Sequence, residues 1–181
     1  SVAAPEPARS PPAEPKQHFS VSTLLGVRKL DKATWDLVDD QYVLGLSATW
    51  HPEASILGLE SDFAFSVGTH QSFFSFFDDW SAGTTMELSG GPRIDLPLWS
   101  SPFRINAGLG PSLLYAGFED TRGSDSDMTL GLYAHAGFWI ELGDVHIGLD
   151  YRVLGGTDTD FNGRPGDSDY RQVTFVIGFH Q

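Results

Sequence analysis

The sequence contains no cysteine, few basic residues and no long apolar run. The absence of cysteine among 181 residues excludes disulfides and thiolate metal sites. No stretch of about 18 apolar residues is present, which excludes a transmembrane helix. Only 11 Lys and Arg residues oppose 24 Asp and Glu residues, so the net charge is -13. A chain this acidic repels nucleic acid phosphates, and we expect no nucleic-acid partner.

Aromatic residues and glycine are abundant instead. The chain holds 13 Phe, 5 Trp, 5 Tyr and 20 Gly residues. Aromatic side chains pack well on pleated surfaces, and glycine relieves crowding between strands. The composition therefore predicts an all-β protein, and the length suffices for one domain.

The clearest β pattern lies between Met128 and Val153. Apolar residues hold every second position as far as Leu142, and the alternation resumes after Gly143-Asp144. A strand places successive side chains on opposite faces. The segment therefore predicts two long antiparallel strands joined by a tight turn, with one apolar face and one charged face.

The same alternation recurs along the chain and predicts eight strands, which begin near positions 18, 42, 57, 86, 103, 128, 145 and 171. The connections alternate between long loops and short turns. Fourteen of the 24 acidic residues lie in the long connections, in segments 31–40, 78–79, 119–127 and 157–169. Within the fourth strand, the sequence Gly90-Gly91-Pro92 predicts a β-bulge.

An even number of strands of about ten residues, with long loops at one end and tight turns at the other, is typical of a transmembrane β-barrel. Outward aromatic residues support this topology because they fall into two girdles. The turn end collects Phe19, Trp50, Trp99, Phe103, Phe138 and Phe179, and the loop end collects Tyr42, Phe65 and Tyr115. The apolar face is therefore expected to contact lipid, and a soluble β-sandwich is the alternative.

On these features, and on the closing strand YRQVTFVIGF at 170–179, the chain resembles the small eight-stranded outer-membrane barrels of the OmpA, OmpX and OmpW kind. The resemblance covers residues 17–181 and departs from the class where His180 and Gln181 follow Phe179. It implies a bacterial outer membrane, periplasmic termini and extracellular long loops. Residues 1–16, rich in Pro and Ala, are expected to form a periplasmic tether.

The inward face is predicted to carry many charged side chains, namely Arg28, Glu60, Asp62, Glu87, Arg93, Asp95, Arg104, His135, Glu141, His146, Asp150, Arg152 and Arg171. An eight-stranded barrel is just wide enough for side chains to fill it. We therefore expect these groups to pair across the lumen as an ionic plug. Arg93, Arg104, Glu141 and His146 should lie at similar depth near the turn end, and a catalytic or proton-conducting role for them is the alternative.

The chain shows no catalytic set, and we expect no enzyme. A lipid hydrolase of the outer membrane would need His and Ser on the lipid-exposed face. Instead, the register points five histidines inward and places His70 in a loop; the five are His18, His51, His135, His146 and His180. We interpret the chain as a structural or interaction module of the envelope, which contacts lipopolysaccharide or envelope proteins through its acidic loops. A narrow OmpW-like channel for small or hydrophobic solutes is the alternative, and an enzyme that modifies lipid A is the next.

Two loops carry candidate binding residues. The last long loop matches the EF-hand calcium pattern at Asp158, Asp160, Asn162 and Gly163, but Asp169 stands where the motif has Glu. Such residues are also common in turns, so calcium is the one cofactor we consider. The earlier loop holds Phe73, Phe74, Phe76, Phe77 and Trp80, which predict an interaction surface or an extension of the upper girdle.

Overall fold

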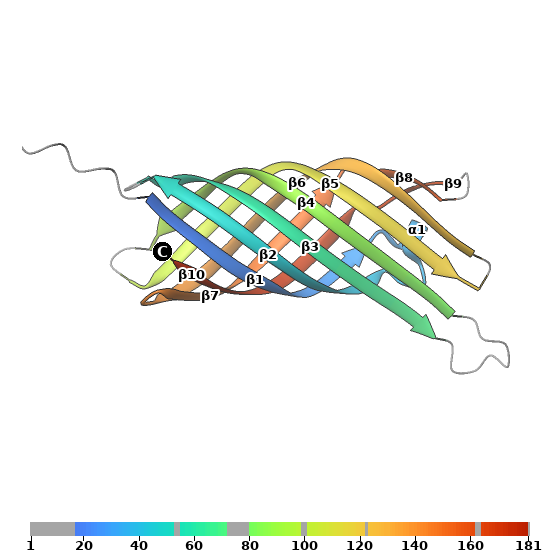
Figure 1. Cartoon of the computed structure of the whole chain (residues 1–181), viewed down its shortest axis with the longest axis horizontal. Coiled ribbons are helices and arrows are strands. Elements are labelled where there is room, and N and C mark those ends of the chain that lie inside the picture. The colour runs from blue at the N-terminus through green and yellow to red at the C-terminus, as the bar shows by residue number, and fades with distance from the viewer. Residues whose placement is uncertain are drawn as a thin grey trace, which may run out of the picture.

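The computed structural model describes residues 17–52, 55–71, 80–98, 101–121, 123–161 and 164–180. Eight strands form one closed antiparallel barrel, in which β1 pairs with both β2 and β10 (Figure 1). This confirms the predicted eight-stranded, up-and-down fold. The predicted tether, residues 1–16, lies outside the described residues.

The barrel strands are neighbours in the chain except where β1 meets β10, as up-and-down order requires. Their bounds are β1 Gln17–Leu30, β2 Asp40–Pro52, β3 Leu57–Gln71, β4 Trp80–Pro97, β5 Phe103–Asp120, β6 Gly123–Leu142, β7 Val145–Gly155 and β10 Tyr170–His180. Three small elements lie outside the barrel wall, namely α1 Lys32–Trp35, β8 Asp158–Phe161 and β9 Arg164–Asp167.

Alternating burial along the strands separates two surfaces. In β10, residues from Tyr170 to Gly178 alternate strictly between buried and exposed, because successive side chains point to opposite sides of the barrel wall. The outward positions are apolar, and Leu46, Leu130 and Leu132 are 55%, 69% and 70% exposed. The apolar faces do not pack against each other, which excludes the β-sandwich. A continuous apolar exterior of this kind suits a bilayer and not water.

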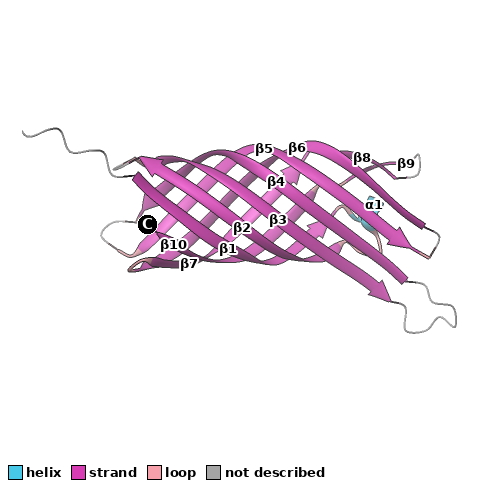
Figure 2. Cartoon of the chain, in the orientation of Figure 1, coloured by secondary structure: helices cyan, strands magenta, loops and turns pink. Residues whose placement is uncertain are grey.

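The two ends of the barrel differ in structure. Figure 1 shows that β1 begins and β10 ends at the same end of the barrel, where the tight turns lie. The elements α1, β8 and β9 lie at the opposite end. Figure 2 shows that most of the described chain is strand. At the turn end, Leu142 pairs with Val145 around Gly143, whose φ of 69° suits glycine. No helix among the described residues is long and apolar enough to cross a bilayer.

The predicted bulge at Gly90-Gly91-Pro92 is wrong. Residues of β4 pair one to one with β3 through this segment, with Leu59 opposite Pro92 and Ser61 opposite Gly90. The glycines serve close approach instead, because a Cβ on Gly91 would lie 2.1 Å from the carbonyl oxygen of Leu109 on β5.

Two long connections are more ordered than expected. Strands β5 and β6 continue pairing up to Asp120 and Gly123, so segment 118–127 is an extended hairpin and not a loop. The last connection contains a second small hairpin, in which β8 pairs with β9. We expected loops here because these segments are acidic. Their residues nevertheless pair as antiparallel strands.

Two single positions also correct the predicted register. Arg171 is exposed on the outward face, because it shares its side of β10 with Val173, two residues on. His70, expected in a loop, belongs to β3 and pairs with Ser81 on β4. Neither change alters the number or order of the strands.

The outward face of β2 tests whether hydrocarbon surrounds the barrel. Leu46 lies at the middle of β2 and Leu57 at the turn-end start of β3. We expect Leu46→Arg to lower the free energy of unfolding by about 2–4 kcal/mol and Leu57→Arg by about 1 kcal/mol or less, since the cost of a lipid-facing cation depends on depth. Urea unfolding of protein inserted in lipid vesicles measures both. Equal losses at the two positions would contradict a bilayer around this face.

Candidate functional site: the lumen and its two ends

The lumen is filled by charged and polar side chains from the inward face of the barrel wall. Arg28, Glu60, Glu87, Arg93 and Arg152 are each no more than 5% exposed. Burial of a charge costs several kcal/mol unless hydrogen bonds and an opposite charge accompany it. The partners of each group therefore decide whether the lumen is stable.

Glu87 on β4 is the centre of a first cluster of lumen charges, in the half of the barrel nearer the loop end. Its Oε2 lies 2.7 Å from Nη2 of Arg28, and its Oε1 lies 3.4 Å from Nη1 of Arg152. Ser112 Oγ donates to Oε1 over 2.9 Å, and the Tyr170 hydroxyl donates to Oε2. One carboxylate thus joins strands β1, β5, β7 and β10 to β4.

The two arginines around Glu87 are satisfied on their other sides as well. Arg28 donates from Nε to Gln172 over 2.9 Å, and its guanidinium lies 3.7 Å from the centre of the Tyr170 ring. Arg152 donates to Asp62 and lies over the Tyr133 ring at 4.3 Å. Stacking on aromatic faces is typical of buried guanidinium groups.

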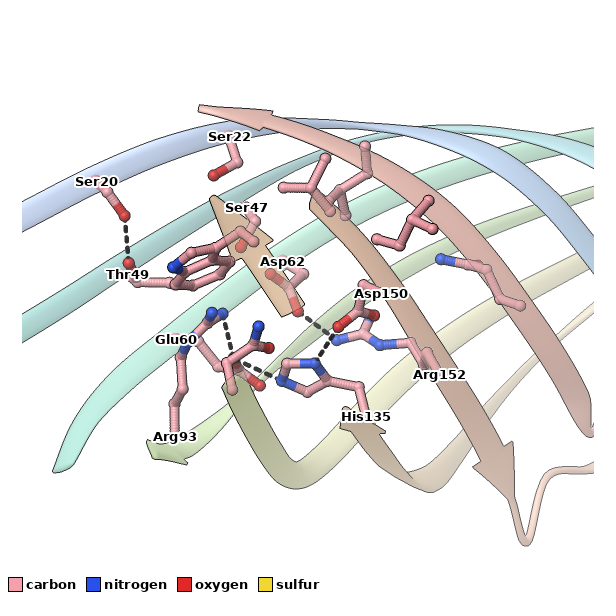
Figure 3. Close-up of a pocket in the computed structure, with 16 residues that line it drawn as sticks. Ser20, Ser22, Ser47, Thr49, Glu60, Asp62, Arg93, His135, Asp150 and Arg152 are labelled. Carbon is pink, nitrogen blue, oxygen red and sulfur yellow. Dashed lines mark hydrogen bonds and ion pairs between the residues drawn. The ribbon is translucent and has the colours of Figure 1, made fainter. Parts of the chain in front are cut away.

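A second cluster, nearer the turn end, is centred on Glu60 of β3 (Figure 3). Its carboxylate lies 3.2 Å from Nη1 of Arg93 and 2.9 Å from Nε2 of His135, and it accepts a 2.8 Å hydrogen bond from Tyr133. His135 Nδ1 lies 2.5 Å from Asp150. Tyr133 therefore joins the two clusters, because the Arg152 guanidinium stacks on its ring and its hydroxyl donates to Glu60.

A glycine on β5 makes room for this second cluster. A Cβ on Gly108 would lie 2.3 Å from Glu60 Oε1 and 2.5 Å from His135 Nε2. Any side chain at Gly108 would push these two groups apart. The sequence pattern does not reveal this role of Gly108, since the need for space appears only when the opposite strands are in position.

At the turn end, the remaining predicted lumen residues form smaller pairs. Arg104 donates to Glu141 over 2.9 Å, and Asp95 lies between Arg93 at 3.1 Å and His51 at 2.5 Å. We predicted that Arg93, Arg104, Glu141 and His146 lie at similar depth. Arg104 and Glu141 do pair with each other, but Arg93 also contacts Glu60 of the second cluster. A cavity of about 450 Å³ opens beside Arg104 and Glu141.

His146 comes closest to a catalytic arrangement. Its Nε2 lies 2.8 Å from Ser22 Oγ, and its Nδ1 lies 3.1 Å from His180 Nε2. His146 is fully buried, however, and the internal cavity that Ser22 borders measures about 30 Å³. That volume holds about one or two water molecules, and Ser22 itself is buried.

An apolar plug, absent from the sequence predictions, closes the loop end of the lumen. Trp35 of α1 is 1% exposed and packs in a cluster with Leu30, Val38, Leu114, Ala116, Tyr133, Leu154 and Tyr170. The Trp35 ring meets the edge of Phe161 from β8 at 5.5 Å. Because loop residues follow no periodic pattern, nothing in the sequence marked Trp35 as buried.

Hydrogen bonds fasten this plug to the loops around it. Asp31 caps α1 by accepting from the backbone N–H of Ala33 over 2.8 Å. Thr34 Oγ1 accepts from the backbone N–H of Asp167 over 2.9 Å, and Asp31 N–H donates to the carbonyl of Asp169 over 3.0 Å. The first and last long connections therefore close the barrel together.

The candidate calcium residues are spread along the last connection. Asp158 and Asp160 lie exposed on β8, while Asp169 accepts from the backbone N–H and the hydroxyl of Thr157. Asn162 lies outside the described residues. No three acidic or His side chains in the described ranges gather as a metal site would require, and calcium binding stays a prediction.

The aromatic loop also stays a prediction. Phe73, Phe74, Phe76 and Phe77 lie outside the described residues. Trp80 begins β4 and pairs with Gln71 of β3, so at its backbone the segment continues the barrel wall.

Comparisons with known proteins show the fold. No protein-family model and no curated protein matches the chain. Among solved structures, Ail, the attachment invasion locus protein of Yersinia pestis, superposes with a TM-score of 0.61 at 14% identity, over 92% of this chain and 99% of Ail. Neisserial surface protein A superposes with 0.58 at 11% identity, over 90% and 96%.

The N-terminal β-barrel domain of Pseudomonas aeruginosa OprF superposes with a TM-score of 0.54 at 8% identity, over 93% of this chain and all of that domain, a coverage of 100%. Identities this low establish a shared barrel architecture and no shared activity. The resemblance to small eight-stranded outer-membrane barrels is thereby confirmed at the level of fold.

The lumen network yields a test at Glu87. We expect Glu87→Gln to lower the free energy of unfolding by about 3–5 kcal/mol, because two buried guanidinium groups lose their shared counter-charge. Urea unfolding in lipid vesicles measures the loss. Glu119→Gln on the exposed end of β5 is the matched control and should change little. Equal effects of the two variants would show that the Glu87 pairs contribute no stability.

Proposed function

We propose that this protein is a sealed outer-membrane barrel that acts through its surface, as an anchor or interaction module of the cell envelope, and has no enzymatic role. One observation carries the proposal: among the described residues, the cavity bordered by Glu60, Asp62 and Arg152 in the middle of the lumen measures about 30 Å³. A pore needs continuous space, and ion pairs that satisfy each other do not release their partners to a passing solute without cost.

The loop end supports contact with partners. Acidic residues on the β5–β6 hairpin include Glu119, Asp120, Asp125 and Asp127, and the β8–β9 hairpin adds Asp158, Asp160 and Asp167. In the proposed orientation these residues face the outside of the cell. Charge on exposed loops selects oppositely charged partners and raises association rates.

A comparison with Ail helps to define the charge of the proposed partner. Ail has been crystallised in complex with the heparin analogue sucrose octasulfate. A polysulfate would be repelled by the acidic hairpins of the present chain, whose net charge is -13. The proposed partners therefore carry positive charge, and direct contact with lipopolysaccharide phosphates is less favourable than contact with basic protein segments.

Conductance tests the sealed lumen. We expect no steady single-channel current from the wild-type protein in planar bilayers, since the clusters around Glu87 and Glu60 fill the cross-section. A variant with Arg28, Asp62, Glu87 and Arg152 all replaced by Ala removes two charges of each sign and should show openings if it inserts. Steady wild-type conductance would overturn the proposal and favour the narrow channel.

The absence of cysteine allows a clean test of orientation. We expect Thr121→Cys, in the β5–β6 turn, to react with a membrane-impermeant maleimide on intact cells, because the loop end lies outside. Asp144→Cys, in the turn of β6 and β7 at the other end, should react only after the outer membrane is permeabilised. The wild-type chain, with no Cys, gives the background. The reverse pattern would place the acidic end in the periplasm.

A further inference from the structure

A pocket of about 690 Å³ lies at the loop end, outside the apolar plug. Its walls come from α1, the β8–β9 hairpin and the extended β5–β6 hairpin, which Figure 1 shows together at the end away from the termini. This volume falls in the range of sites that bind small molecules or a few residues of a peptide. The pocket is separate from the lumen network described above.

Three aromatic residues line this pocket, one from each wall. Trp35 comes from α1, Phe118 from β5 and Phe161 from β8. All three pack in or against the plug, so their rings are held by the barrel itself. The β8 wall is fixed to the β6 wall because the backbone N–H of Asp160 donates to Asp127 over 2.8 Å.

Carboxylates line the pocket beside the aromatic rings. Asp120 and Asp125 belong to the lining, and the two hairpin segments 119–127 and 157–169 hold eight acidic residues against Arg122 and Arg164. Even with both arginines counted, the surroundings are negative. Aromatic faces next to carboxylates attract cations, since the ring quadrupole and the carboxylate charge act in the same direction.

A buried hydrogen-bond donor provides a separate indication of a ligand. Trp35 is 1% exposed, and its indole N–H has no hydrogen-bond partner among the described residues. Buried polar groups in native proteins are nearly always paired, so this N–H calls for an acceptor. A simple cation carries none, whereas a peptide carries a backbone carbonyl next to its charged side chain.

We infer that this pocket is a docking site for a basic peptide segment of a partner protein, with one Arg or Lys side chain entering between the partly exposed rings of Phe118 and Phe161 and the carboxylates of Asp120 and Asp125. The inference rests on the proposed function and names the partner's chemistry. Close approach of the segment would bring a carbonyl oxygen toward the indole N–H of Trp35.

Indole N–H signals in NMR spectra test the inference on the full chain in detergent micelles. The 5 tryptophans give separate signals, and Trp35→Phe identifies that of Trp35. The probe is acetyl-Ala-Arg-Ala-amide, with acetyl-Ala-Gln-Ala-amide as the uncharged control. We expect the Arg peptide alone to shift the Trp35 signal in a saturable manner, while the signal of Trp139 at the other end of the barrel stays in place.

Matched variants separate the pocket from general electrostatics. The double variant Asp120→Asn/Asp125→Asn should weaken binding about tenfold. Asp36→Asn removes an exposed charge at the C-cap of α1, outside the pocket lining, and should change binding less than about twofold. Heat-modifiable gel mobility checks that each variant remains a folded barrel.

Several outcomes would overturn the docking site. These are the absence of a saturable shift, an equal shift from the Gln peptide, equal weakening by Asp36→Asn, or equal binding of spermidine, which would indicate a polyamine site. If the lumen stays closed and the loop end stays labelled on cells, such a failure concerns the docking site alone. Steady conductance would overturn the proposed function whatever the peptide does.

Discussion

The structure depends on one buried carboxylate, Glu87, between two guanidinium groups. Arg28 comes from β1 and Arg152 from β7, and the three residues are far apart in the chain. Arg28 and Glu87 compensate each other's charge, and Arg152 is shared between Glu87 and Asp62. Because β1 also pairs with β10 to close the barrel, closure of the wall and completion of the ionic network stabilise each other and should occur together.

This arrangement inverts the plan of a soluble protein. The exterior is apolar and the interior polar, so once the barrel lies in lipid, contacts between apolar side chains no longer favour one conformation over another. The hydrogen-bonded lumen then has to specify the native state. Among the described residues, the apolar core lies around Trp35 and Val38, at the loop end, where the environment changes from lipid to water.

Period-two alternation predicted the eight strands and the inward position of Glu60, Glu87 and Arg152, because the direction of a side chain in a strand is a local property. The partners of these charges were not predictable, since pairing across the lumen depends on strand tilt and stagger. Trp35 was missed because a loop has no periodicity. The supposed bulge at Gly90-Gly91-Pro92 failed because the same residues also permit two backbones to approach closely.

The proposed sealing of the lumen shifts the functional question to the two ends, and these ends differ in charge and in structure. The turn end pairs its ions internally, as Arg104 and Glu141 do. At the loop end, the β5–β6 hairpin carries its carboxylates beyond the plug. Salt screens such charges within about 8 Å under physiological conditions, so they act only on a partner that is already close. The proposed recognition at this end combines short-range charge with the rings of Phe118 and Phe161, which pack against the plug, and it should weaken as ionic strength rises.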